Sequence, residues 1–310
     1  MFNHSNQQQA PFVMTPYNPP FYPDLTVFEH PSVSFDYPVE REFIRQRPGA
    51  LFFYNIDTRM GATATLGAGG NYQYVSRIPG FGRWTHIVGT ANGALLFYNA
   101  DSGVGATATL DAGGNYRYVG SLSGFGRWTH IVSANQGSLL FYNADTGIGA
   151  TATLDAGGNY RYVSRIPGFG RWTHIVGSAN GALLFYNADS GVGATATLDA
   201  GGNYRYVGSI TRFGSWTHIA SANQGSLLFY NANTRVGATA TLDAGGNYRY
   251  VGSLSGFGRW THIVGLANGA LLFYNADSGV GATATLDTGG NYRYVGSLSG
   301  FGRWTHIAGV

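Results

Sequence analysis

Six copies of one 44-residue unit follow one another without a gap, and this periodicity constrains the fold more than any other feature. The segment LLFYN begins at residues 95, 139, 183, 227 and 271, with LFFYN at 51. A unit this short cannot bury its apolar face alone, so consecutive copies must pack against each other. One tryptophan marks the same position of every unit: Trp84, Trp128, Trp172, Trp216, Trp260 and Trp304.

A second period overlies the first. Threonine at position 58, 146 and 234 alternates with serine at 102, 190 and 278. The alternation indicates growth by duplication of a two-repeat unit. Identity between repeats therefore reflects ancestry as well as selection.

Each unit predicts four short strands separated by turn sequences. In the unit that starts at Trp128, strands are expected over 128–132, 138–143, 149–154 and 159–163. These segments are rich in aromatic and branched residues or alternate in polarity. Glycine-containing turns separate the strands, and the loop 164–171 leads to the next tryptophan. Helix signals are absent.

Four strands per unit, repeated six times, predict an all-β fold: a six-bladed β-propeller of four-stranded antiparallel blades over residues 47–310. A β-solenoid is the alternative, but it usually has shorter rungs and needs capped ends. The chain ends with a lone first strand at 304–308, whereas the first repeat begins at its second strand, with Leu51. The last strand is therefore expected to complete the first blade and close the ring.

Residues 1–46 are expected to form an extended, proline-rich arm or linker. Seven of the ten prolines lie in residues 1–40, together with a polar NQQQ run. The segment 41–45 (REFIR) stands in the phase of a first strand and is an alternative partner for the first blade. In that case, residues 1–40 would form a degenerate seventh blade.

The charge of the chain is mildly positive, with 18 arginines, no lysine and a formal net charge of +3. Spread over six repeats, this charge is too dilute for a dedicated nucleic-acid binder. The chain has no cysteine, so its composition leaves the redox compartment undetermined. Neither a secretory signal nor an apolar run of membrane-spanning length is visible. Synthesis in the cytoplasm, with possible non-classical release, is the expectation.

The first candidate binding patch is an aromatic residue and an arginine beside each tryptophan. Aromatic rings stack on the C–H face of a sugar, and a guanidinium fork suits its hydroxyl groups. The alternative is that the tryptophan anchors neighbouring blades. The fourth such loop departs from the pattern, with Arg212 and Ser215 around Phe213. The predicted site residues are Phe125, Arg127, Trp128, Phe169, Arg171, Trp172, Phe257, Arg259 and Trp260, with counterparts at Phe81, Arg83, Trp84, Phe301, Arg303 and Trp304.

The second candidate patch lies in the last hairpin of each repeat, on the opposite face. Aspartate, asparagine and arginine together offer the donors and acceptors that a hydroxyl-rich ligand needs. The alternative is a hairpin whose Asp and Asn satisfy their own backbone. The first repeat has Gly67 and Gln73 at two of these positions. The predicted residues are Asp111, Asn115, Arg117, Asp155, Asn159, Arg161, Asp199, Asn203, Arg205, Asp243, Asn247, Arg249, Asp287, Asn291 and Arg293.

No metal or cofactor is predicted. The motif Asn99-x-Asp101 resembles a calcium loop, but no acidic residue follows to complete the shell. One histidine per repeat, such as His130, is expected in a structural role, hydrogen-bonded near the central channel. The repeats contain no Glu, Cys or Lys. Because sixfold repetition does not make the asymmetric carboxylate pair of a glycosidase, the sequence predicts that the protein is not an enzyme.

The repeat W-x-x-I-V, followed by G-x-L-L-F-Y-N and a T/S-G turn, resembles the tachylectin-like propeller lectins of bacteria and fungi. The resemblance covers residues 47–310. It implies a propeller fold and sugar sites between adjacent blades, up to six in number.

The sequence therefore predicts a multivalent carbohydrate-binding protein, with glycans or glycoconjugates as partners. The alternative is a structural or protein-interaction scaffold that uses residues 1–46 for assembly, as in a homo-oligomer. A third hypothesis is nucleic-acid binding, because YRY in five repeats flanks an arginine with two rings that can stack on bases.

Overall fold

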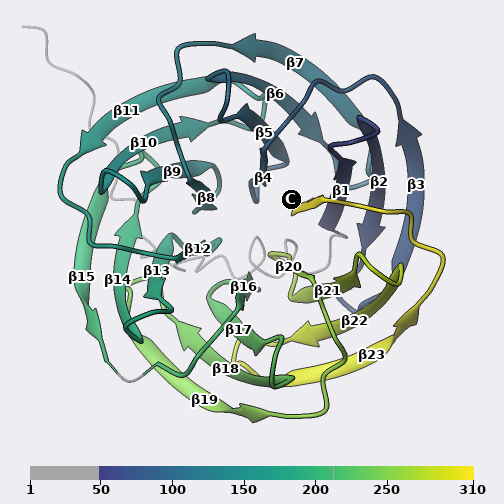
Figure 1. Cartoon of the computed structure of the whole chain (residues 1–310), viewed down its shortest axis with the longest axis vertical. Helices are drawn as coiled ribbons and strands as arrows, with labels where there is room; N and C mark the ends of the chain where they lie inside the picture. Colours follow the sequence, from purple (N-terminus) through teal and green to yellow (C-terminus); the bar gives the residue numbers. More distant parts are fainter. Residues whose placement is uncertain (1–48, 212) are drawn as a thin grey trace, which may run out of the picture. The chain divides into compact units, whose positions relative to one another are not determined.

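A computed structural model describes residues 49–211 and 213–310, and these residues form six antiparallel four-stranded sheets. The sheets are arranged around a central axis as the blades of a propeller (Figure 1). We number them by their strands: blade 1 contains β24 and β1–β3, and blades 2 to 6 contain β4–β7, β8–β11, β12–β15, β16–β19 and β20–β23. The predicted six-bladed propeller is confirmed. The predicted arm over residues 1–46 and the alternative seventh blade lie outside the described residues.

The strands of each blade follow one another outward from the axis. The innermost strands are β24 (His306–Gly309), β4 (His86–Gly89), β8 (His130–Ala134), β12 (His174–Gly177), β16 (His218–Ala222) and β20 (His262–Gly265). The second strands are β1 (Gly49–Asn55), β5 (Ala94–Asn99), β9 (Ser138–Asn143), β13 (Ala182–Asn187), β17 (Ser226–Asn231) and β21 (Ala270–Asn275).

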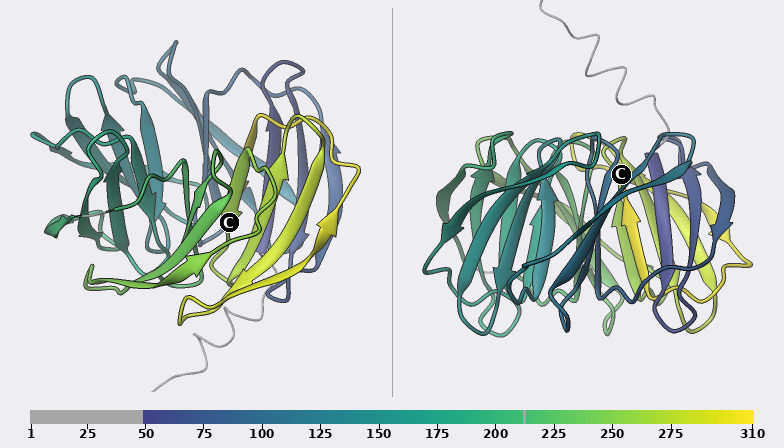
Figure 2. Two further views of the ribbon diagram at one scale, coloured as in Figure 1. Left: turned by 60° about the horizontal axis from the view of Figure 1, so that its bottom comes forward. Right: turned by 90° about the horizontal axis from the view of Figure 1, so that it is seen from above.

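The outer half of each blade has two longer strands. The third strands are β2 (Met60–Leu66), β6 (Val104–Leu110), β10 (Ile148–Leu154), β14 (Val192–Leu198), β18 (Val236–Leu242) and β22 (Val280–Leu286). The outermost strands are β3 (Tyr72–Ile78), β7 (Tyr116–Leu122), β11 (Tyr160–Ile166), β15 (Tyr204–Ile210), β19 (Tyr248–Leu254) and β23 (Tyr292–Leu298). Figure 2 shows the same blades from two further directions.

The ring closes through the last strand of the chain. β24 pairs antiparallel with β1, with Phe52 opposite Ala308 and Tyr54 opposite His306. The first blade is thereby completed by the C-terminal segment, as the sequence predicts. Closure leaves no open end of the repeat array, which an open superhelix would have to cap.

The core consists of six apolar clusters, each shared by two adjacent blades. In one of them, Leu140 and Tyr142 of blade 3 pack with Leu183 and Phe185 of blade 4. All four side chains are at most 1% exposed. No blade therefore has a core of its own, and each depends on its neighbours for burial.

The outermost strand differs from the prediction in length and in phase. We expected a strand over 159–163 followed by a loop, whereas β11 continues to Ile166. A bulge lies where Thr151 pairs with Ser164 but Ala152 pairs with Tyr162, so Val163 is left without a partner in the register. The same register shift occurs in all six blades. One extra residue shifts the alternation by one, and the side chains after the bulge change sides.

The innermost strands are connected by a closed ring of histidines. His130 Nε2 lies 3.1 Å from the carbonyl oxygen of Thr173 in the next blade, and Nδ1 lies 2.8 Å from the hydroxyl of Thr129. Because a carbonyl only accepts, Nε2 carries the hydrogen. Equivalent bonds of 3.0–3.2 Å join all six blades, and His306 returns to Thr85. This ring of hydrogen bonds agrees with the structural role that the sequence predicts for these histidines.

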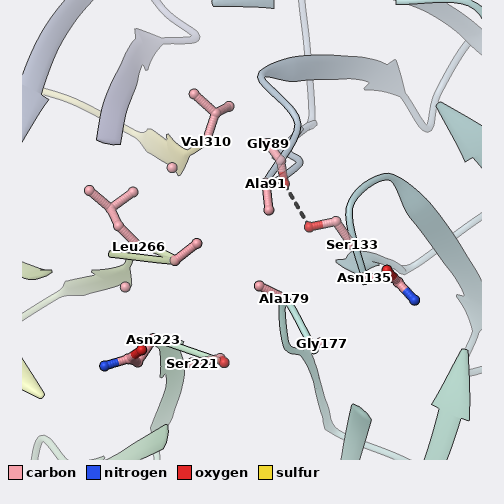
Figure 3. Close-up of a pocket in the computed structure, with 13 residues that line it drawn as sticks. Gly89, Ala91, Ser133, Asn135, Gly177, Ala179, Ser221, Asn223, Leu266 and Val310 are labelled. Atoms are coloured by element: carbon pink, nitrogen blue, oxygen red, sulfur yellow. Dashed lines mark hydrogen bonds between the residues drawn. The ribbon is translucent and has the colours of Figure 1, made fainter. Parts of the chain in front are cut away.

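The central channel is narrow because the innermost strands approach one another closely. It holds about 70 Å³ and is lined by small residues such as Gly89, Ser133 and Ala179 (Figure 3). A Cβ atom on Gly89 would overlap the carbonyl oxygen of Gly309. The Ser133 hydroxyl donates to the carbonyl of Gly89 at 2.6 Å. Separately, the described part of the chain contains no helix that could cross a membrane.

Candidate functional site: grooves between adjacent blades

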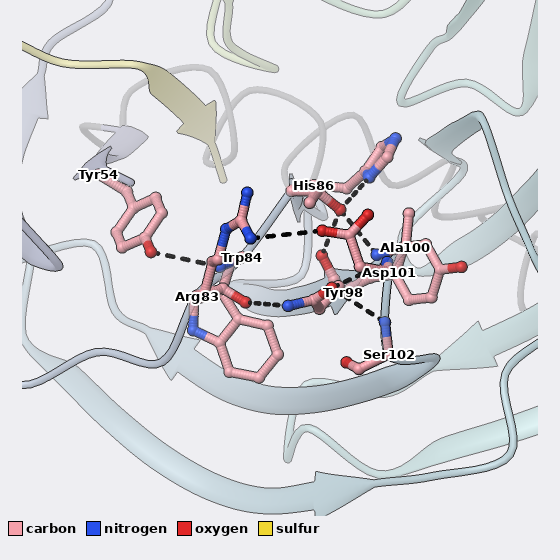
Figure 4. A network of polar contacts seen from close by, with 10 residues as sticks. Tyr54, Arg83, Trp84, His86, Tyr98, Ala100, Asp101 and Ser102 are labelled. Atoms are coloured by element: carbon pink, nitrogen blue, oxygen red, sulfur yellow. Dashed lines mark hydrogen bonds and ion pairs between the residues drawn. The ribbon is translucent and has the colours of Figure 1, made fainter. Parts of the chain in front are cut away.

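The loop that enters each blade is held by a buried tyrosine of the preceding blade. Between blades 1 and 2, the Tyr54 hydroxyl donates to the carbonyl of Gly82 at 2.7 Å and accepts from the backbone N–H of Trp84 at 3.2 Å (Figure 4). The Asn99 amide donates to the carbonyl of Arg83 at 2.8 Å. Corresponding bonds recur in all six repeats. The position of the tryptophan backbone is thereby fixed in every loop.

The calcium-like motif is a turn. Asn99 Oδ1 accepts from the backbone N–H groups of Asp101 and Ser102, at 2.9 and 3.2 Å. This is the local hydrogen bonding by which asparagine stabilises turns. Within residues 49–211 and 213–310, no three His, Asp or Glu side chains gather in a way that would hold a metal ion.

The first predicted patch divides into a core residue and two surface residues. The Phe125 ring packs between blades, 5.3 Å from the Tyr160 ring and 5.6 Å from the Tyr98 ring. Trp128 also contacts the core, 5.6 Å from Phe141, but its indole remains half-buried. The Arg127 side chain is exposed. The structure therefore agrees in part with each of the two hypotheses, the binding patch and the anchor between blades. Phe125 packs between blades, whereas Trp128 lies at the boundary with solvent.

Sequence reasoning missed the most exposed large aromatic residue of each repeat. This is the second tyrosine of the outermost strand, whose exposure is 53–56% in every blade: Tyr74, Tyr118, Tyr162, Tyr206, Tyr250 and Tyr294. Two positions earlier, the first tyrosine packs into the interior. Burial raises the pKa of Tyr160 to about 12, so its hydroxyl is protonated at neutral pH. The YRY triplet contained the signal, but we considered it only for stacking on nucleic-acid bases.

In blades 1 and 5, a groove lies between the entering loop and the outermost strand that it crosses. In blade 5 it holds about 260 Å³ and is lined by Phe213, Trp216, Tyr248 and Tyr250. Ile210, at the end of the preceding blade's outermost strand, also lines it. We call this feature the inter-blade groove and number it by the blade that supplies its two tyrosines.

The inter-blade groove of blade 1 is built in the same way and continues into a second cleft. The first part holds about 230 Å³ and is lined by Phe301, Trp304, Tyr72 and Tyr74. The adjoining cleft, about 330 Å³, shares Tyr74 and Trp304 and adds Arg77. Both parts are several times larger than the central channel. A half-buried indole, an exposed phenol ring and a guanidinium group are thus brought together.

The second predicted patch lies in the hairpins and uses much of its own hydrogen-bonding capacity. Asp111 Oδ1 accepts from the backbone N–H groups of Gly113 and Asn115, both at 2.9 Å, and the Asn115 amide donates to Oδ2 at 2.9 Å. These bonds to Asn115 hold the pKa of the Asp111 carboxyl below its usual range. Asp111 and Arg117 line a cleft of about 540 Å³ together with Gln136 of the next repeat.

No family model matches the sequence, and no curated protein matches it. Solved structures match the fold. A putative 6-phosphogluconolactonase from Bacteroides fragilis has 11% identity and a TM-score of 0.56, over 85% of this chain and 98% of that one. Another, from Bacteroides uniformis, has 12% identity and a TM-score of 0.56, over 86% and 100%. A functionally unknown protein from Desulfotomaculum acetoxidans has 10% identity and a TM-score of 0.55, over 81% and 80%.

These names contradict the prediction that the protein is not an enzyme. Two neighbours of the same fold are named as putative lactonases, so a propeller fold does not argue against catalysis. The error came from treating sixfold repetition as evidence about chemistry. At 11% and 12% identity, the likeness shows the fold alone. None of the three is named as a lectin, so the resemblance to propeller lectins extends only to the propeller.

Proposed function

We propose that the propeller is a multivalent carbohydrate-binding protein with one sugar site in each inter-blade groove. The observation that carries this proposal is the recurrence of one exposed tyrosine and one half-buried tryptophan in all six repeats. In blades 1 and 5 the two residues line the same groove. Exposed aromatic rings lining a groove are suited to the apolar C–H faces of sugar rings. Six equal placements around one axis suit a ligand that is itself repeated.

The groove also supplies polar groups. Within the described residues, no hydrogen bond engages the indole N–H of Trp304 or the hydroxyl of Tyr74. Both groups remain available to a ligand. The Trp304 indole packs on the core, 5.6 Å from the Phe53 ring, and Tyr74 lines the same groove. A rigid ring with a free polar tip loses little conformational entropy on binding.

Multivalency explains why weak single sites would suffice. A shallow groove that contacts one or two sugar rings binds weakly, whereas several grooves on one multivalent glycan raise the overall affinity by about 10²–10⁴. Removing one site from such a protein costs less than removing all of them.

Glycan-array binding and agglutination test the proposal on the full chain. The informative variants replace the six exposed tyrosines together, either by alanine or by phenylalanine. We expect alanine to abolish glycan binding, because the stacking surface is lost, and phenylalanine to retain most of it. The tyrosine-to-alanine change at Tyr162 alone should weaken agglutination only modestly. A folded propeller that binds no glycan, or an alanine variant that binds normally, would overturn the proposal.

A further inference from the structure

The outermost strands of the six blades carry one of two residue types three positions after the exposed tyrosine. In four blades this residue is a serine whose hydroxyl lies 2.7–2.8 Å from the tyrosine hydroxyl, as in Tyr118 and Ser121. In blades 1 and 3 the residue is an exposed arginine, Arg77 or Arg165. These two arginines also leave the hydroxyls of Tyr74 and Tyr162 free of that bond.

The bulge turns this position toward the groove. In blade 1, Tyr74 pairs with Ala64 and Arg77 pairs with Ala62. Ala62 and Ala64 are two residues apart on β2 and therefore face the same side. Arg77 consequently shares the face of Tyr74, although strict alternation would place it on the opposite one. In blade 3, Arg165 has the same register and the same exposure.

A second arginine lies in the same cleft. Arg303, in the loop before Trp304, lines the cleft of about 330 Å³ together with Arg77, and no carboxylate lines it. Neither arginine takes part in an ion pair within the described residues. By contrast, Arg83 of blade 2 lies 3.6 Å from the Asp101 carboxylate. Blade 3 repeats the arrangement in sequence, with Arg127 in the loop and Arg165 on the strand.

Two unpaired guanidinium groups beside two aromatic rings suit a sugar that carries a carboxylate. The rings accept the sugar ring, and the planar forks match a carboxylate in geometry and charge. A nucleic acid fits less well, because binding to a continuous phosphate backbone uses many adjacent cations. Here the two cationic grooves are separated by blade 2, where Ser121 takes the place of the second arginine.

We propose that the grooves of blades 1 and 3 select acidic sugars through Arg77 and Arg165, while the other grooves bind neutral sugars. The selection rests on the proposed function, since it requires that the grooves bind sugars at all. Blade 5 provides the natural contrast, because Ser215 and Ser253 occupy both arginine positions. One propeller would therefore present two classes of site to a glycan of mixed charge.

The test compares methyl glycosides of glucose, galactose and mannose with the corresponding uronates, which replace the C6 hydroxymethyl group by a carboxylate. Crystals of the full chain are soaked at equal concentrations, and affinities are measured by calorimetry. We expect uronates to occupy the grooves of blades 1 and 3 first, with affinity about tenfold above the matched hexose at low salt. Added salt should reduce the difference.

Two double variants, each of which removes two positive charges, show which arginines cause the preference for uronates. R77S/R165S introduces the serine that four other blades carry, and it should remove the preference for uronates while hexose binding remains. R59G/R235G removes two arginines that line neither groove described above, at turn positions where the other four repeats have glycine. It should leave the preference intact. The variant S121R should create a third groove that selects uronates.

The outcomes separate this proposal from the one on which it depends. Equal filling of all six grooves by hexoses and uronates, or a preference that survives R77S/R165S, overturns charge selection and leaves the lectin proposal standing. Absence of every sugar from every groove overturns both. A short single-stranded oligonucleotide that binds more tightly than any uronate, in a manner abolished by R77S/R165S, replaces acidic sugars with nucleic acid as the ligand.

Discussion

The second and the outermost strand of a blade contain similar aromatic residues but serve different purposes. In β9, every side chain from Ser138 to Asn143 is buried, because both faces meet neighbouring blades. In β11, Tyr160 packs inward whereas Tyr162 is 56% exposed. Blades diverge with distance from the axis, so the side chains of adjacent sheets can no longer meet at the rim. The inner strands therefore stabilise the ring, and the outer strands leave grooves that remain open to a ligand.

The largest expected effect is at the inner edge, where β24 closes the ring. Removal of residues 304–310 leaves β1 without its inner partner, and breaks the histidine ring at both His262 and Thr85. We expect loss of the cooperative unfolding transition and aggregation through the open strand edge. Circular dichroism during thermal unfolding and size-exclusion chromatography measure this.

A truncated chain that stays monomeric and unfolds at the same temperature would contradict the role assigned to β24. It would favour the other candidate for the innermost strand, residues 41–45, which lie outside the described residues. A control truncation of Val310 alone should change much less, because it removes only one backbone hydrogen bond, from its N–H to the carbonyl of Ala50, and the packing of one partly buried side chain.

A matched pair of substitutions in blade 3 compares the two strands directly. Phe141 is 1% exposed and touches the rings of Phe125, Trp128 and Tyr160. Phe141→Ala should lower the free energy of unfolding by about 3–5 kcal/mol. Tyr162→Ala, on the open side of the same blade, should cost less than about 1 kcal/mol but weaken glycan binding. Denaturant unfolding of both variants checks this, and equal losses of stability would remove the distinction between core and groove.

The histidine ring makes the inner region sensitive to mild acid. Burial lowers the pKa of His130 below its ordinary value, and the neighbouring histidines of the ring lower it further. Because the unfolded chain takes up protons more readily, the stability contributed by neutral His130 is fully present above about pH 6.5 and declines below it. Denaturant unfolding at pH 7.5 and pH 5 should show this decline, and His130→Gln should reduce it.

The acidic hairpins titrate in a separate window. Hydrogen bonds lower the pKa of Asp111 and its equivalents, so their contribution to stability is lost only below about pH 4. A loss between pH 7.5 and pH 5 therefore reports on the histidines. If the free energy of unfolding does not change between pH 7.5 and pH 5, protonation of the histidine ring does not destabilise the fold.

Period, turn chemistry and the phase of the last strand were enough to predict the blades and the closure of the ring. The grooves were harder to predict, because they depend on the bulge beside Val163. No residue in the segment NYRYVSRI is of a type that predicts a bulge. Strict alternation places Arg165 on the face opposite to Tyr162, whereas the register places both on one face. Alternation also places Tyr160 and Tyr162 on the same face of the strand and therefore predicts the same exposure for both. Tyr160 is covered because Phe125 of the entering loop packs on its ring at 5.3 Å, a contact between segments far apart in sequence.

The smallest expected effect concerns the turn between the second and third strands of a blade, where substitutions between repeats should change stability very little. Arg235 has a φ of 57°, a left-handed conformation in which glycine stands in four other repeats, as at Gly103. Arg235→Gly removes the strain of a side chain in this region but increases the entropy of the unfolded chain. We expect a net gain of about 0.5 kcal/mol, and a loss of similar size for the reciprocal change Gly103→Arg. Denaturant unfolding measures both. A change above about 2 kcal/mol in either variant would mean that this turn supports the ring as strongly as the inner strands do.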